Sequence, residues 1–133
     1  MTVELEVIKA CIIIPAYNEE KTIRQVINGL PDDMDIIVVD DGSIDSTADR
    51  VRQTRAKLIR HEQNLGYCAA IRSALKHCQS EIIITLDADG QHKCSDVTRL
   101  LDVMNTTKAD LVLGSRFKGI KRKNIYDVIV ERI

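Results

Sequence analysis

The sequence predicts an α/β protein in which helices cover both faces of a mainly parallel β-sheet. Short apolar segments rich in β-branched residues alternate with segments whose apolar residues recur at helical spacing. The apolar segments are nearly continuous, which is typical of strands that are buried on both faces. The chain has 133 residues, of which 44% are hydrophobic, enough for the core of a single domain over residues 1–133.

Five strands are expected, and most of them end in Asp, Gly or Pro. They are CIIIP (11–15), DIIVVD (35–40), KLIR (57–60), EIIITLD (81–87) and DLVLG (110–114). Helical connections between them make the strands parallel, so their carboxyl ends gather at one edge of the sheet. Ligands of open α/β sheets bind at this edge, and functional residues are therefore expected at the strand ends.

Helices are expected between the strands. Two segments have apolar residues at positions i, i+3, i+4 and i+7, namely Ile23, Val26, Ile27 and Leu30 in the first and Val97, Leu100, Leu101 and Met104 in the second. A similar stripe runs through residues 70–78, and another helix is expected to carry Ala48 and Val51. The last segment, NIYDVIVERI (124–133), is expected to form a closing helix.

Charge and cysteine content narrow the function classes. The chain has 19 basic and 20 acidic residues, a balance that argues against nucleic-acid binding driven by bulk charge. Its four cysteines form no C-x-x-C motif, so neither a zinc knuckle nor a redox motif is indicated. No apolar run approaches the ~20 residues that span a bilayer, and the N-terminus does not read as a signal peptide. A soluble cytoplasmic protein is expected, with peripheral contact to the cytoplasmic face of a membrane left open.

The first two strand ends carry polar residues that can be read in two ways. In PAYNEE, Pro15 stops the strand, and the residues after it either cap the next helix or present Tyr17 and Glu19 to a ligand. In VVDDGSIDST, Asp40 and Asp41 either begin a turn or present a carboxylate to a ribose or a base edge. Because side chains alternate along a strand, the two aspartates are expected to point in different directions.

The fourth strand ends in IIITLDADGQH, which combines two aspartates one residue apart with an amide and an imidazole. Asp87, Asp89 and Gln91 offer oxygen atoms of the kind that hard divalent cations prefer. A cation held there would neutralise a diphosphate, whereas the alternative is a solvated polar turn. His92 is expected to lie at the surface or to support a ligand residue.

The fifth strand is followed by a basic segment, GSRFKGIKRK (114–123). Arg116 comes directly after the Gly-Ser turn and either pairs with a phosphate or belongs to a solvated charged segment. Acidic and phosphate-seeking groups thus follow strands one, two, four and five, where the fold predicts a ligand site. Turn residues without a function would be scattered over both ends of the sheet.

Taken in order, these motifs resemble family 2 glycosyltransferases of the GT-A fold, a Rossmann-like fold. The segments that carry the resemblance are IIIPAYNEEKTI, IIVVDDGSIDST, NLGYCAAIRSAL, IIITLDADGQH and DLVLGSRF, from about Cys11 to Lys118. DADGQH followed by GSRF is most similar to the dolichyl- or polyprenyl-phosphate mannose and glucose synthases. Such proteins usually read N-x-G-K-G-x-A in the third motif, where this chain has Tyr67 and Cys68 in place of the lysine and the second glycine.

The resemblance implies inverting transfer of mannose or glucose from a GDP- or UDP-linked donor to an acceptor, expected to be a polyprenyl or dolichyl phosphate. It implies Mg²⁺ or Mn²⁺ as the cofactor, with Asp87 and Asp89 as the D-x-D pair and Gln91 as a further metal ligand. Arg116 is implied to face the phosphates and to act in catalysis with the two aspartates. The residues implied to line the donor site are Pro15, Tyr17, Glu19, Asp40, Asp41, Asp87 and Asp89.

The chain stops soon after GSRF, so it is expected to hold the nucleotide-binding half of such an enzyme. It is then either a shortened chain or a short protein that forms a homodimer over the exposed sheet edge. A binding module without transfer activity is the main alternative. Nucleotidyl transfer is disfavoured because PAYNEEKTI lacks the glycines of a phosphate loop, and a receiver-like domain because no lysine ends strand five.

Overall fold

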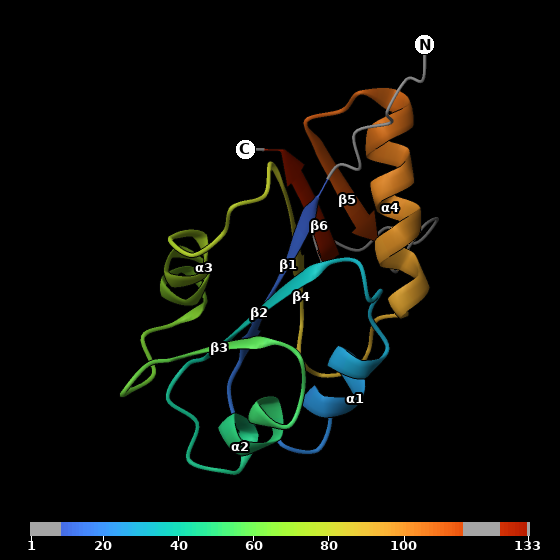
Figure 1. Ribbon diagram of the computed structural model, residues 1–133. Helices are drawn as coiled ribbons and strands as arrows, with labels where there is room; N and C mark the ends of the chain where they lie inside the picture. The colour runs from blue at the N-terminus through green and yellow to red at the C-terminus, as the bar shows by residue number, and fades with distance from the viewer. Residues whose placement is uncertain (1–8, 116–125, 133) are drawn as a thin grey trace.

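The computed structural model describes residues 9–115 and 126–132. Strands and helices alternate along the chain, and the α/β class predicted from the sequence is confirmed (Figure 1). The elements are β1 (Ala10–Ala16), α1 (Ile23–Asn28), β2 (Asp35–Asp40), α2 (Thr47–Arg52), β3 (Lys57–Arg60), α3 (Tyr67–Leu75), β4 (Ile82–Leu86), α4 (Cys94–Thr107), β5 (Leu111–Ser115) and β6 (Tyr126–Arg132). All five predicted strands are present at the expected places.

The sheet has six strands in the order β3-β2-β1-β4-β6-β5. Strands β1 to β4 are parallel, and β6 pairs antiparallel with both β4 and β5. Two antiparallel pairings in succession leave β5 parallel to β4. The sheet is therefore mainly parallel, as predicted. Strands β3 and β5 are its edges, and a homodimer that covers an exposed edge stays a prediction.

The prediction of a closing helix at the C-terminus was wrong, because Tyr126–Arg132 forms strand β6. Short apolar runs do not distinguish a strand from a helix by periodicity alone. The β-branched residues Val128, Ile129 and Val130 favour a strand. Their place between β4 and β5 gives the segment a paired strand on each side, so tertiary pairing decides in favour of the strand.

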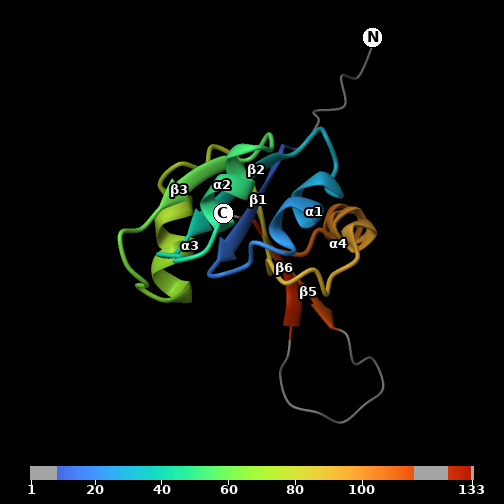
Figure 2. The same ribbon diagram turned by 90° about the horizontal axis from the view of Figure 1, so that it is seen from below.

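Alternate residues of each central strand pack into two separate layers. Ile12 and Ile14 of β1 point into the larger layer, which α1, α2 and α4 cover. Cys11 and Ile13 point into the smaller layer, which α3 covers (Figure 2). The two predicted helical stripes are confirmed as core, since all eight of their residues are buried. The stripe in α3 is confirmed in part: Ala70 and Ala74 are buried, whereas Leu75 is 40% exposed.

This topology brings the ends of three strands together. Strand β1 lies between β2 and β4, so the loops after Ala16, Asp40 and Leu86 leave the sheet side by side at its carboxyl edge. Strand β5 runs in the same direction and ends at Ser115. Arg116 follows it but lies outside the described residues. No helix in the described part of the chain is long and apolar enough to cross a membrane.

Candidate functional site

The loops after β1 and β2 are fastened to each other by hydrogen bonds between backbone and side chains. The N–H of Asn18 donates to Ser43 Oγ at 2.9 Å, and the N–H of Glu19 donates to Thr47 Oγ1 at 2.8 Å. In return, the N–H of Ile44 donates to Asn18 Oδ1 at 3.0 Å. These bonds hold the predicted site residues Tyr17 and Glu19 at the carboxyl edge, where the Tyr17 side chain is exposed.

A second set of bonds joins the same two loops further along. The N–H of Glu20 donates to Asp45 Oδ2 at 3.2 Å, and the N–H of Ser46 donates to Glu20 Oε2 at 3.0 Å. Burial raises the pKa of Asp45, but hydrogen bonds from Thr47 and from the Glu20 N–H outweigh this effect and lower it. None of these residues is among those predicted for the donor site. Their signal was the preference of Asp and Ser for side-chain bonds to nearby backbone.

Glu19 also connects the first loop to the end of β4. The hydroxyl of Thr22 lies 3.2 Å from Glu19 Oε2 and donates to the carbonyl oxygen of Ala88 at 2.7 Å. Ala88 stands between the two aspartates of the predicted D-x-D pair. The loops after β1, β2 and β4 are therefore one connected structure, which can hold several functional groups in fixed positions.

Asp40 is fully buried at the end of β2 and turned toward the turn that follows. Its Oδ1 accepts a hydrogen bond from the Ser43 N–H at 2.9 Å. Its Oδ2 lies 3.2 Å from Arg60 Nε in an ion pair, but it accepts no hydrogen bond of good geometry from the described residues. Its place in a donor site stays a prediction.

Asp41 points in another direction, as the alternation of side chains predicted. Its Oδ1 accepts the Leu65 N–H and its Oδ2 accepts the Gly66 N–H, both at 2.9 Å. Nδ1 of His61 lies 2.7 Å from Asp41 Oδ1, and the other ring nitrogen lies 2.8 Å from Ser73 Oγ. The carboxylate thus binds the loop between β3 and α3 to the end of β2. Contact of Asp41 with a base or ribose stays a prediction.

These contacts make the stability of the fold depend on the charge of Asp41. Burial raises the pKa of Asp41, but hydrogen bonds from Leu65, His61 and Gly66 lower it by more, so it lies below its ordinary value of 3.8. A carboxyl group whose pKa is lowered by folding stabilises the protein above its unfolded pKa. That stabilisation is lost as the pH falls through the folded pKa.

We expect Asp41→Asn to lower the free energy of unfolding by about 2–3 kcal/mol at pH 7, because the backbone N–H groups of Leu65 and Gly66 lose a charged acceptor. The difference in unfolding free energy between wild type and variant should shrink as the pH falls below 3.8 and through the lowered pKa of Asp41, because Asp41 itself then becomes protonated. Urea unfolding at several pH values measures both effects. Asp102→Asn, at an exposed position on α4, is the control and should leave the pH profile unchanged. A difference in unfolding free energy that stays constant as the pH falls would contradict the stabilising role assigned to the Asp41 carboxylate.

The end of β4 carries the predicted D-x-D pair on a tight turn. The Gln91 N–H donates to Asp89 Oδ1 at 3.0 Å, and Gly90 has a φ of 77°, a conformation that favours glycine. The Asp87 N–H donates to His92 Nε2 at 3.3 Å, and the same ring nitrogen lies 3.6 Å from Asp87 Oδ2. The His92 side chain is only 5% exposed. His92 therefore supports Asp87 from the buried side of the turn, and supporting a ligand residue is one of the two roles expected for His92.

The donor set at this turn suits a hard divalent cation. Asp87 and Asp89 are both partly exposed, and Gln91 beside them is exposed, so oxygen atoms are available to solvent at the carboxyl edge. Within residues 9–115 and 126–132, no three His, Cys, Asp or Glu side chains are grouped to hold a metal by themselves. A cation here would need further ligands from an amide, water or a bound diphosphate, as Mg²⁺ commonly does at phosphate sites.

Tyr67, where the resemblance expects a lysine, lies beside the aspartate pair. Burial raises the pKa of Tyr67, the charge of Asp87 adds to the increase, and a hydrogen bond with Thr85 opposes it. A phenol with a raised pKa stays protonated near neutral pH and remains a hydrogen-bond donor. In the sequence, Tyr67 stands out only as a departure from the usual motif, because its interactions with Thr85 and Asp87 are tertiary.

A mainly parallel sheet with helices on both faces and paired aspartates at the end of a central strand is the Rossmann-like architecture of the GT-A class. The family described as "Glycosyl transferase family 2" matches residues 11–129. The chain belongs to this family. The resemblance noted in the sequence is thereby confirmed.

Known relatives agree with this assignment. A UDP-N-acetylglucosamine–dolichyl-phosphate N-acetylglucosaminyltransferase from Methanococcus voltae is 35% identical over 132 residues, which cover 83% of this chain and 53% of that protein. The chain thus spans about half the length of this curated relative. Membership of this family supports transferase chemistry.

Solved structures give the same fold. A mannosyltransferase from Pyrobaculum calidifontis, in complex with GDP-Man and Mn²⁺, superposes with a TM-score of 0.76 at 18% identity, over 93% of this chain and 44% of that one. Glucosyl-3-phosphoglycerate synthase from Mycobacterium tuberculosis, in complex with Mn²⁺, UDP and glucosyl-3-phosphoglycerate, superposes with a TM-score of 0.72 at 27% identity, over 84% and 44%.

Proposed function

We propose that this chain is the nucleotide-sugar-binding part of a glycosyltransferase that moves a hexose, mannose or glucose, from a GDP- or UDP-linked donor to a polyprenyl or dolichyl phosphate. The anomeric carbon is inverted in the proposed reaction, and Mg²⁺ or Mn²⁺ is the cofactor. The proposal includes a cytoplasmic location, peripheral to the membrane face where a lipid phosphate would be met. The relative that uses dolichyl phosphate and the synthase solved with Mn²⁺ and UDP support it.

The observation that carries the proposal is the joining of three loops at one edge of the sheet. Thr22 connects Glu19 to the D-x-D turn, and Asn18 connects the same loop to the turn after β2. A nucleotide sugar has a base, a ribose, a diphosphate and a sugar, and each part needs its own contact. Loops from neighbouring parallel strands supply such contacts at the usual ligand site of this fold.

In the proposed site, Asp87, Asp89 and Gln91 would hold the cation, which stabilises negative charge on a diphosphate leaving group when bound. Pro15, Tyr17, Glu19, Asp40 and Asp41 would shape the nucleotide site. Arg116 would face the phosphates. A phosphate acceptor is already ionised at neutral pH, so this reaction needs no strong general base in the chain.

Calorimetric titration with GDP, UDP and their mannose and glucose conjugates, with and without Mn²⁺, tests the proposal. We expect one nucleotide to bind with Mn²⁺ and to bind at least about tenfold more weakly in EDTA, because the cation bridges carboxylates and phosphates. UDP-N-acetylglucosamine belongs in the series because the Methanococcus relative uses it. Failure of every nucleotide to bind to a folded chain would overturn the proposal.

A binding module without transfer activity is the second candidate. The observation that favours it is the third motif, where Tyr67 and Cys68 stand in place of the usual lysine and second glycine. A transfer assay with a polyprenyl phosphate separates the two candidates after binding has been found. 3-Phosphoglycerate serves as a second acceptor, since the solved synthase carries its glucosyl product.

A further inference from the structure

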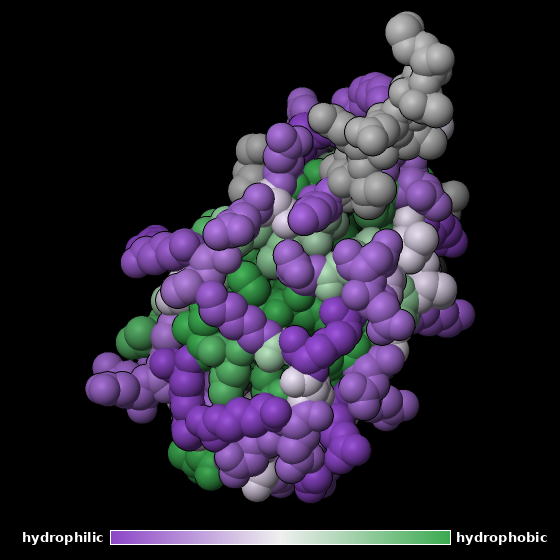
Figure 3. Space-filling view, viewed as in Figure 1, coloured by the Kyte–Doolittle hydropathy of each residue, from purple (hydrophilic) through white to green (hydrophobic). Residues whose placement is uncertain are grey.

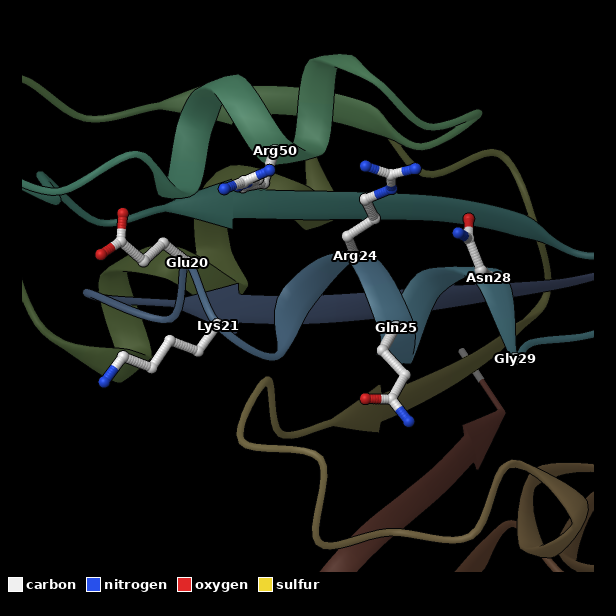
Figure 4. A pocket seen from close by; sticks show the side chains of 7 residues that line it. All are labelled: Glu20, Lys21, Arg24, Gln25, Asn28, Gly29 and Arg50. Carbon is white, nitrogen blue, oxygen red and sulfur yellow. The ribbon is translucent and has the colours of Figure 1, made fainter.

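A groove of about 860 Å³ lies over α1 and α2 (Figure 4). Its lining includes Lys21, Arg24, Asn28 and Arg50, and its described lining contains none of the residues predicted for the donor site. Binding sites for small molecules usually have volumes of roughly 300–1,000 Å³. The surface around it is mainly hydrophilic, with apolar residues visible between the polar ones (Figure 3). The groove is therefore of a suitable size for a small polar ligand.

Arg24 of α1 and Arg50 of α2 extend into the space between the two helices (Figure 4). Among the described residues, no carboxylate forms an ion pair with Lys21, Arg24 or Arg50, although several other arginines of the chain are paired. Arg24 makes one hydrogen bond of 3.4 Å, to the neutral amide of Gln53. Like charges that share a groove repel each other, and an anion between them would remove this repulsion.

Glu20 is the one acidic residue in the described lining of the groove, and its side chain already accepts a hydrogen bond. Glu20 Oε2 accepts the Ser46 N–H at 3.0 Å, at the end of the groove near the loop after β2. It lowers the positive charge of the groove without reversing it, since three cations remain against one carboxylate. Asn28 adds an amide, which can bond to hydroxyl groups as donor and as acceptor.

We propose that the groove between α1 and α2 is a second ligand site, which binds a phosphate ester carrying hydroxyl groups through Arg24 and Arg50. Planar guanidinium groups bind pairs of oxygen atoms, and a phosphate ester offers three acceptor oxygens and more negative charge than a carboxylate, so it can bind both arginines at once. A soluble glycerol or sugar phosphate and the phosphoglycerol headgroup of a lipid share this chemistry. The proposal is independent of the donor site and of its metal.

The test is an NMR titration of ¹⁵N-labelled protein with glycerol 3-phosphate in EDTA, followed by sedimentation with phosphatidylcholine vesicles that contain or lack phosphatidylglycerol. We expect Arg24→Gln and Arg50→Gln each to weaken binding about tenfold, because each removes a charge-assisted pair of hydrogen bonds. Glu20→Gln keeps the acceptor for Ser46 and removes a repulsive charge, so it should tighten binding about threefold. The matched control is Arg52→Gln, since Arg52 lies on α2 outside the groove and is paired with Asp49.

Three outcomes decide the proposal. Saturable binding of glycerol 3-phosphate that Arg24→Gln and Arg50→Gln weaken, and Arg52→Gln does not, supports a soluble ligand. Binding only to phosphatidylglycerol vesicles, with the same dependence on Arg24 and Arg50, supports a lipid headgroup. No binding of either kind, or equal weakening by Arg52→Gln, overturns the proposal. The titration is repeated in Asp89→Ala, so that a failure of the donor site does not affect the result.

Discussion

Gly42→Ala is expected to destabilise the fold by about 3–5 kcal/mol, a large part of the stability of a domain of this size. Gly42 follows Asp41 and has a φ of 76°, where a side chain is strained. A Cβ at this position would lie 2.4 Å from the carbonyl carbon of Gln63 and 2.6 Å from the nitrogen of Asn64. Backbone atoms cannot turn away as a flexible side chain can, so the loop between β3 and α3 would have to move.

That movement would break the hydrogen bonds from Leu65 and Gly66 to Asp41, which lie in the same loop. Gly66→Ala is the matched control, because Gly66 has a φ of 94° but no atom within 4 Å of the added Cβ. It should show the backbone strain alone, about 1–2 kcal/mol. Urea unfolding measures both variants. Equal losses of unfolding free energy in the two variants would mean that the short distances from the added Cβ of residue 42 to Gln63 and Asn64 cost no stability.

The fold could be predicted almost completely because its signals are local. Ile, Leu and Val gather in short runs, and helical stripes separate the runs, so the parallel direction of most strands follows from the alternation alone. The order of the strands in the sheet does not follow from it. Strand β6 was missed for the opposite reason. The apolar run from Val128 to Val130 is too short to distinguish the residue spacing of a strand from that of a helix. Strand formation depends on pairing with β4 and β5, and β4 lies more than 40 residues earlier in the chain.

The candidate site was predictable to a smaller extent. Parallel topology explains why Asp87, Asp89 and the loop from Tyr17 to Glu19 reach one edge, and the motifs identified these residues. The partners of Asp41 could not be found in this way. His61 and Gly66 lie 20 and 25 residues further along the chain, and their contacts depend on how the loop folds back over β2. The groove between α1 and α2 likewise depends on helix packing, which no motif marks.

Removal of the second carboxylate of the D-x-D pair tests the donor site directly, provided that the turn itself stays intact. Asp89 has two roles, since its Oδ1 accepts the Gln91 N–H at 3.0 Å and its charge is proposed to hold the cation. Asp89→Ala removes both roles. Asp89→Asn keeps a carbonyl oxygen for the Gln91 N–H and removes only the charge, so the two variants together separate the cation site from the shape of the turn.

We expect both variants to weaken nucleotide binding in Mn²⁺ by about 100-fold or more, because one of two anionic ligands of the cation is lost. Binding in EDTA should be almost equal in wild type and in Asp89→Asn, since only the part that depends on the cation is removed. Asp102→Ala, an exposed aspartate on α4, controls for the change of net charge. Calorimetry measures all of them. Wild-type affinity in Mn²⁺ for Asp89→Asn would show that no cation binds at this turn, and the proposed transfer would lose the group that stabilises its leaving diphosphate.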